Sequence, residues 1–166
     1  AVSCDHLTGL FNRRAFVEAA ELEMQRWARS PRPLSLVMID ADHFKRINDQ
    51  YGHVTGDGVL RHMAASMTAT FRAMDVLARF GGEEFIVLLR EAEGGQAIEV
   101  AEKIRRRTEQ LTFSYDNQPL RLTTSIGLSS LQPGDTLHAL LTRADRALYR
   151  AKQAGRNRVC SDTRHE

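Results

Sequence analysis

The sequence predicts one α+β domain, residues 1–166, in which a mainly antiparallel sheet is flanked by helices. Apolar residues recur at spacings of three and four in four long segments, as they do along one face of an amphipathic helix. Two apolar runs meet at a Gly-Gly pair, which indicates an antiparallel hairpin and argues against a doubly wound parallel sheet. A chain of 166 residues can also bury a core without a metal or disulfide cross-link.

The amino-terminal half of the chain predicts a helix, a strand and further helix. An apolar stripe over residues 17–27 indicates a helix that ends at residues 30–33, because the two prolines there cannot continue it. Residues 34–40 form an apolar run that ends in an acid, which is typical of a buried strand. A short helical turn at residues 44–49 and a longer helix with its stripe at residues 60–71 follow.

A hairpin is predicted where residues 76–80 and 84–89 flank Gly81 and Gly82. Both flanking runs are apolar, and a Gly-Gly pair between two such runs is a hairpin signal. Tight primed turns need positive φ, which glycine adopts at little cost. We therefore expect the two glycines to form a turn of this kind.

The carboxyl-terminal half predicts a helix, a strand, a second helix and an edge strand. Residues 97–111 carry an apolar stripe at helical spacing, and residues 122–128 alternate as a strand does. Another helical stripe covers residues 137–151, and Gly155 is placed to cap its end. Residues 158–160 are predicted as the edge strand.

Charge and cysteine content argue against several classes of partner. The formal charge of +2 is too small to indicate nucleic acid or a membrane surface, and Arg105 to Arg107 is interpreted as a solvated helix face. Cys4 and Cys160 lie near opposite ends without a metal-binding spacing, so we expect reduced thiols and a cytoplasmic location. No apolar run approaches the ~20 residues of a membrane helix. Because the chain starts at Ala1, we expect a piece of a longer protein, which could be anchored to a membrane elsewhere.

Three carboxylates are predicted to converge at one edge of the sheet. Asp40 ends an apolar strand, and Glu83 and Glu84 begin the second strand of the hairpin. If these strands are neighbours, their acidic ends meet, and close carboxylates ionise together comfortably only with a cation between them. Mg²⁺ suits such a site because it binds one or two carboxylates and takes its other ligands from water and phosphates. In the alternative, Asp40 caps the next helix and the glutamates only solubilise the hairpin, although Asp42 is the better cap candidate.

Polar residues elsewhere suit a ligand that carries phosphates and a purine. Lys45 could steady phosphate oxygens beside a metal, as phosphoryl transfer requires. Asn48 and Asp57 could bind guanine, because a carboxylate accepts from its ring N–H and its amine. Lys152 and Arg156 could bind a triphosphate. Local explanations stay open for all of them: a turn-forming asparagine, a helix entry, and cations that balance a helix dipole.

Four motifs resemble those of GGDEF-domain diguanylate cyclases. Residues 81–85 (GGEEF) are similar to the family's signature, in the variant with glutamate at the third position. Residues 5–14 resemble the family's opening motif, residues 40–57 its metal and guanine segment, and residues 143–157 its closing helix. The motifs follow in the family's order and span nearly the whole chain, so the sequence is identified as a member of this family.

The resemblance implies a fold similar to the catalytic palm of adenylyl cyclases and polymerases, and the condensation of two GTP into cyclic di-GMP with release of pyrophosphate. It implies that Asp40, the main-chain carbonyl of Ala41 and Glu83 bind Mg²⁺, or Mn²⁺ in its place. It also implies that Glu83 or Glu84 deprotonates the attacking 3′-hydroxyl, without deciding between them. The residues that it assigns to GTP, on guanine and ribose or on the triphosphate, are Phe44, Lys45, Asn48, His53, Asp57, Lys152 and Arg156, with Lys45 also counted as catalytic.

The resemblance further implies a homodimer. One domain offers one GTP site, whereas the product needs two attacks, so two copies must face each other, and a symmetric pair is the natural arrangement. An upstream regulatory region would control this assembly.

Arg72 and Asp75 have two interpretations. Their i, i+3 spacing is explained by a local ion pair. An R-x-x-D five residues before the signature also resembles the family's inhibitory site, which binds the product cyclic di-GMP, and arginine can pair with phosphate and stack on guanine. Lys103 or Arg106 on the following helix would complete that site.

An active cyclase has two alternatives. A catalytically silent module could act as a receptor for GTP or cyclic di-GMP, but degenerate members usually lose the signature, and the acids and Lys45 are retained here. A cyclase that makes adenine-containing dinucleotides would need a different base site, and Asn48 with Asp57 indicates guanine.

Overall fold

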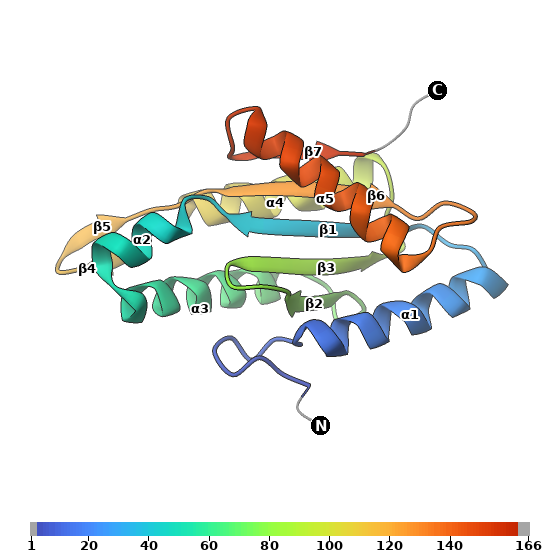
Figure 1. Cartoon of the computed structure of the whole chain (residues 1–166), viewed down its shortest axis with the longest axis horizontal. Helices are drawn as coiled ribbons and strands as arrows, with labels where there is room; N and C mark the ends of the chain where they lie inside the picture. Colours follow the sequence, from blue (N-terminus) through green and yellow to red (C-terminus); the bar gives the residue numbers. More distant parts are fainter. Residues whose placement is uncertain (1–2, 163–166) are drawn as a thin grey trace.

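The computed structural model describes residues 3–162, which form a central sheet with helices on both faces (Figure 1). Five strands make the sheet, in the order β2-β3-β1-β6-β7. The helices, in chain order, are α1 (Arg13–Arg29), α2 (Phe44–Tyr51), α3 (His53–Thr70), α4 (Gly95–Gln110) and α5 (Leu137–Gln153). The strands are β1 (Leu34–Ala41), β2 (Val76–Arg79), β3 (Glu84–Arg90), β4 (Phe113–Tyr115), β5 (Gln118–Leu120), β6 (Thr124–Ser130) and β7 (Arg158–Ser161).

The sheet is mainly antiparallel, as predicted. β1 lies at its centre and pairs antiparallel with β3 and β6, and β2 pairs antiparallel with β3. β7 lies at the edge and runs parallel to β6. The α+β class, the β2–β3 hairpin and the carboxyl-terminal edge strand are therefore confirmed.

The turn at Gly81 and Gly82 differs from the prediction, because neither glycine has positive φ. The Phe80 and Gly81 N–H groups both donate to the Glu84 carbonyl, which closes a wider connection than a two-residue primed turn. The reason for a glycine at position 81 is space: a Cβ there would lie 2.6 Å from Glu84 Oε1. Gly81 thus leaves room for a carboxylate.

A primed turn does occur in a hairpin that the sequence reasoning missed. β4 and β5 pair antiparallel around Asp116 and Asn117, which have φ of 47° and 63°. This φ > 0 pair is typical of two-residue hairpins, and an Asp-Asn pair between short runs was the available signal. Figure 1 shows this hairpin beside α2, away from the main sheet, and Tyr51 and Tyr115 stack edge to face there.

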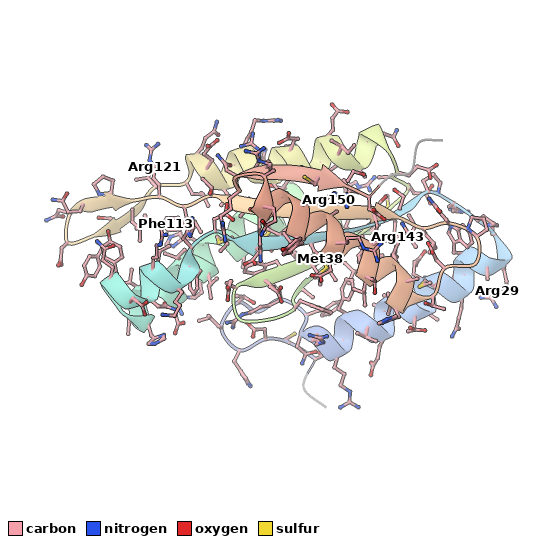
Figure 2. The ribbon with its side chains drawn as sticks, turned by 45° about the horizontal axis from the view of Figure 1, so that its top comes forward. Arg29, Met38, Phe113, Arg121, Arg143 and Arg150 are labelled. Atoms are coloured by element: carbon pink, nitrogen blue, oxygen red, sulfur yellow. The ribbon has the colours of Figure 1, made fainter. Side chains whose placement is uncertain are left out.

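The hydrophobic core lies on both faces of the sheet because β1 is buried along its whole length. Val37 and Ile39 face a cluster that includes α3 and α4, whereas Leu36 and Met38 face a cluster that includes α1 and α5. Figure 2 shows Met38 under α5. This two-sided burial explains the uninterrupted apolar run of β1.

Helix α5 ends at Gln153 and is capped by Gly155, as predicted; Gly155 has φ of 121°. The Gly155 N–H donates to Lys152 O, and the Arg156 N–H donates to Ala151 O at 3.0 Å. These are the two bonds of a Schellman cap. The cap reverses the chain and returns Arg156 and Asn157 toward the end of β1.

Within residues 3–162, no helix is long and apolar enough to span a bilayer. Cys4 and Cys160 are free thiols, and Cys4 is exposed.

Candidate active site

The carboxylates of Asp40 and Glu84 face each other at the end of the sheet. The β1–β3 register pairs Asp40 directly with Glu84, and paired residues point to the same face of a sheet. The predicted meeting of the two acidic strand ends is confirmed. Glu84, rather than Glu83, is the residue opposite Asp40, because the strand pairing includes Glu84 whereas Glu83 precedes β3.

Burial and mutual repulsion favour the protonated forms of these two acids. Burial raises the pKa of the Asp40 carboxyl, and the hydrogen bond and charge of Lys152 offset this only in part. Burial also raises the pKa of Glu84, and the negative charge of Asp40 raises it further. Two such carboxylates in one place are ready to accept a cation.

Asp40 has the free acceptor that a metal needs. One of its oxygens pairs with Lys152 Nζ, whereas Asp40 Oδ1 is buried and has no hydrogen-bond partner among the described residues. Residues 3–162 contain no group of three His, Cys, Asp or Glu side chains arranged to hold an ion. The predicted ligands, which are the Asp40 and Glu83 carboxylates and the Ala41 main-chain carbonyl, still fit Mg²⁺, because this ion commonly keeps several water or phosphate ligands.

Asp42 does not cap α2, which corrects the prediction. The residue before α2 is His43, in a left-handed conformation and without a side-chain cap bond. The buried Asp42 carboxylate instead accepts hydrogen bonds from Thr123 Oγ1, Ser125 Oγ and the Asn157 N–H, at 2.6, 2.6 and 3.1 Å. It therefore joins β1, β6 and the segment after α5. Thr123 and Ser125, polar residues at alternate positions where β6 begins, were the signal for this role.

Arg156 lies beside the Asp42 carboxylate, with its Nε 4.0 Å from Asp42 Oδ1. Lys152, one turn earlier on α5, pairs with Asp40. The end of α5 thus brings two cations over the acidic end of β1, from more than 100 residues away in the sequence.

Asn48 and Asp57 are brought close by the packing of α2 on α3. A Cβ on Gly56 would meet the Asn48 carboxamide oxygen, so the carboxamide lies directly against the residue before Asp57. Asn48 is half-buried, and Asp57 and His53 are exposed on the first turns of α3. Gly56 and Asp57 lie inside α3, which begins at His53, so they do not mark the helix entry.

Phe44 and Lys45 differ in burial. The Phe44 side chain is 7% exposed and packs in the core next to Gly56, and its contact with substrate stays a prediction. The Lys45 side chain is 87% exposed and pairs with Asp49 at 2.9 Å. It is free to reach a ligand in solvent, since such an exposed pair contributes little.

The main chain around Glu83 is held on the β1 side. The Ala41 N–H donates to the Glu83 carbonyl at 3.2 Å, so the predicted metal residues Asp40, Ala41 and Glu83 lie together. The Glu83 side chain is half-buried.

Arg72 and Asp75 form the local ion pair, with Arg72 Nη2 3.2 Å from Asp75 Oδ1. Asp75 is buried there and also accepts from the Arg90 N–H. Both residues line a cavity of about 370 Å³, and Lys103 lines it too, whereas Arg106 does not. Lys103 is therefore the better placed of the two candidates on α4.

The fold and this site define a class of protein. It is an α+β domain in which two facing acids at the strand ends, Asp40 and Glu84, can bind a cation and lie beside two basic residues, Lys152 and Arg156. The chain belongs to the GGDEF family, whose model, described as diguanylate cyclase, GGDEF domain, matches residues 2–158. The family resemblance stated from the motifs is confirmed.

Relatives and solved structures agree with this membership. Diguanylate cyclase DgcP of Pseudomonas aeruginosa is 43% identical over 155 residues, which are 93% of this chain and 23% of DgcP. The GGDEF domain of DgcB from Caulobacter crescentus in complex with c-di-GMP has a TM-score of 0.94 and 32% identity, covering 98% of this chain and 96% of that one. The active GGEEF domain of a diguanylate cyclase from Vibrio cholerae has a TM-score of 0.87 and 36% identity, with coverage of 99% and 100%. The chain spans about a quarter to a half of the length of the curated relatives that it matches.

Proposed function

We propose that this chain is a diguanylate cyclase domain that condenses two GTP into cyclic di-GMP and two pyrophosphates. The observation that carries the proposal is the pairing of Asp40 with Glu84 below Lys152, with an unsatisfied buried oxygen on Asp40. Phosphoryl transfer needs such a place, where a metal and cations neutralise phosphate charge. Family membership supports the choice of GTP.

Asp40, the Ala41 carbonyl and Glu83 would hold Mg²⁺, or Mn²⁺ in its place. When bound, the ion would lower the pKa of the attacking 3′-hydroxyl and shield the charge of the α-phosphate.

The other residues bind the nucleotide and move the proton. Lys45, Lys152 and Arg156 would hold the triphosphate, and Asn48, Asp57 and His53 would hold guanine and ribose, with Phe44 behind them. The 3′-hydroxyl oxygen then attacks the α-phosphorus, the bond to pyrophosphate breaks, and a carboxylate takes the hydroxyl proton. Glu84 is favoured over Glu83 for this step, because it lies directly opposite Asp40 in the β1–β3 pairing and the raised pKa of its carboxyl suits a general base.

The reaction would take place across a homodimer, in which each copy presents its 3′-hydroxyl to the α-phosphate held by the other. Assembly under an upstream regulatory region stays a prediction. The free thiols support the cytoplasmic location that we propose.

A product assay tests the proposal. The protein, held as a dimer by a fused dimerisation segment and given GTP with Mg²⁺, is expected to form cyclic di-GMP and two pyrophosphates per product, measured by chromatography. Glu83→Ala and Glu84→Ala should abolish the product while circular dichroism shows a retained fold, and Glu99→Gln, on the exposed face of α4, serves as a control. A wild-type dimer that releases no pyrophosphate contradicts the proposal. If it still binds GTP or cyclic di-GMP, the receptor function is supported instead.

We also propose product inhibition at the cavity lined by Arg72, Asp75 and Lys103. Replacing Arg72 by Ala removes a donor that suits phosphate, so the cyclic di-GMP concentration for half inhibition should rise by about tenfold or more. Lys103→Ala should act in the same direction, and Arg106→Ala, which does not line the cavity, is the matched control. Unchanged inhibition of the Arg72 variant would exclude an inhibitory site there.

A further inference from the structure

The amino-terminal loop lies along the free edge of the β2–β3 hairpin. Phe11 forms an isolated bridge to Ala78 of β2, and its carbonyl accepts the Arg79 N–H at 2.9 Å. Within the loop, the Asp5 N–H donates to the Leu10 carbonyl at 2.7 Å. The loop is therefore an ordered neighbour of the residues just before the glycine connection (Figure 1).

The Asp5 carboxylate organises this loop and reaches the hairpin. It accepts hydrogen bonds from the Thr8 N–H and hydroxyl at 2.9 and 2.8 Å, and from Arg79 Nη1 at 3.2 and 3.3 Å. Burial raises the pKa of Asp5, but the hydrogen bonds from Thr8 and the Arg79 charge outweigh burial and leave the pKa lowered. Each side chain of the Asp5–Arg79 pair is only 20% exposed, so solvent weakens the pair less than it weakens a fully exposed one.

Arg79 also contacts the connection between β2 and β3, residues 80–83. Its Nε and Nη2 donate to the Gly82 carbonyl at 3.0 and 2.8 Å, while Nη1 faces Asp5. The planar guanidinium holds these donors in a fixed geometry relative to one another. The position of the Asp5 carboxylate therefore helps to determine where Arg79 binds the Gly82 carbonyl.

Fixing the Gly82 carbonyl has a direct consequence for Glu83. The peptide unit between them is planar and trans, so the Glu83 N–H points away from Arg79. The next peptide unit is held from the other side, where the Glu83 carbonyl accepts the Ala41 N–H. With both flanking peptides fixed, the backbone dihedrals of Glu83 are fixed, and so is the direction of its Cα–Cβ bond, from which the carboxylate extends.

Phe80 is held by the same region of the chain. The Arg13 guanidinium lies 4.1 Å from the centre of the Phe80 ring, and Phe16 packs against that ring edge to face at 6.0 Å. The start of α1 and the loop before it thus contact both residues that precede the glycines.

We propose that Asp5 and Arg79 are positioning residues, which act as one clamp through the Gly82 carbonyl to hold the Glu83 carboxylate in its working direction. A conformational change in the amino-terminal loop would then alter the position of Glu83 through the Asp5 and Arg79 side chains. The inference rests on the proposed cyclase function, because it assigns Asp5 and Arg79 a role in that reaction. Neither residue touches substrate in this role.

Kinetics of clamp variants give the first test. Asp5→Asn and Arg79→Gln should each lower kcat by about tenfold or more, because a small displacement of a reacting group is costly. The KM for GTP should change little, since the nucleotide residues lie on α2, α3 and α5. The double variant should lose no more than the worse single variant, as expected of two residues in one unit. Asp135→Asn is the matched control, because Asp135 also accepts one backbone N–H and pairs with a half-buried arginine, Arg143. Asp135 lies just before the amino-terminal end of α5, whereas Lys152 lies at its carboxyl-terminal end.

Amide hydrogen exchange gives a second readout that needs no activity. Exchange at residues 81–84 in nucleotide-free protein should quicken in both clamp variants and stay unchanged in Asp135→Asn, while α3 and α4 keep their protection. Full kcat together with unchanged exchange would overturn the clamp. If the wild type makes no cyclic di-GMP, the cyclase proposal fails, and the exchange data still decide whether the clamp holds the connection. Should Asp5→Asn not fold, Arg79→Lys, which keeps the charge but lacks the fork, replaces it.

Discussion

Asp40 and Glu84 show how the fold places two acidic residues where the charged form of each is disfavoured. Each is a carboxylate where burial and a like charge favour the neutral form, and both pKa values are raised. Gly81 keeps the space into which the Glu84 carboxylate fits. The protein alone thus holds an arrangement that a bound cation would relieve.

Replacing Glu84 by Gln is expected to raise the Tm of the metal-free protein near neutral pH. As pH rises above about 4.5, the ordinary pKa of glutamate, unfolded Glu84 ionises before folded Glu84, so the wild type loses stability between these two pKa values. Glutamine lacks this loss. Thermal unfolding across this pH range should show a difference that vanishes at low pH and is fully present above the raised pKa.

Glu99→Gln, an exposed change on α4, is the control for pH effects on the whole protein. A Glu84→Gln variant that is less stable than the wild type at neutral pH, in metal-free buffer, would contradict the idea of repulsion. Added Mg²⁺ should stabilise the wild type more than the variant.

At the scale of elements, the position of α5 decides where Lys152 and Arg156 lie. The helix crosses β6 so closely at Gly127 that a Cβ there would come within 3.0 Å of the main chain at Leu148 and Ala144. Backbone atoms cannot move aside as the end of a flexible side chain can. Gly127 therefore sets the distance between α5 and the sheet.

The substitution Gly127→Ala is expected to destabilise the protein by about 3 kcal/mol, because the helix must shift away from β6. Urea unfolding measures the change. Gly95→Ala is the matched control, since a Cβ on Gly95 meets nothing within 4 Å. A cost equal to that of the control would show that α5 has freedom to adjust. Any Gly127→Ala protein that folds should also bind GTP more weakly, as its two basic residues move.

At the scale of the whole molecule, the site is assembled at one end of the sheet from segments distant in sequence. β1 supplies Asp40, the β2–β3 connection supplies Glu83 and Glu84, and the end of α5 supplies the cations. One chain has one such end, whereas cyclic di-GMP needs two bonds to be made. The whole molecule is thus half of the proposed catalytic unit.

Specific activity is therefore expected to rise with protein concentration for the chain alone, and to become independent of it when a parallel coiled coil is fused before residue 1. The reason is that only the dimer brings each 3′-hydroxyl to the other copy's phosphate. Initial rates over a dilution series, with sedimentation velocity on the same samples, make the comparison. A constant specific activity in samples that remain monomeric would contradict the two-copy reaction.

Much of the fold was predictable because its elements are locally encoded. The helical stripes, the buried run of β1 and the cap at Gly155 depend on neighbours within a few residues, and the structure confirms each of them. The short β4–β5 hairpin was missed because it lacks an apolar run. The predicted type of the Gly-Gly turn was wrong, because hydrogen bonds with the Glu84 carbonyl and the Arg79 side chain determine the conformation there, rather than the intrinsic preference of glycine.

The sequence by itself determined the class of the protein: the helices and strands, the acidic strand ends and the motifs that place the chain in the GGDEF family. Only the tertiary structure decided that Glu84 faces Asp40, that Asp42 joins β1 to β6 and Asn157, and that Lys103 lines the Arg72 cavity. The physical reason is range. Periodicity and capping act within a few residues, whereas strand register and side-chain partners join positions up to 115 residues apart, which only packing can set.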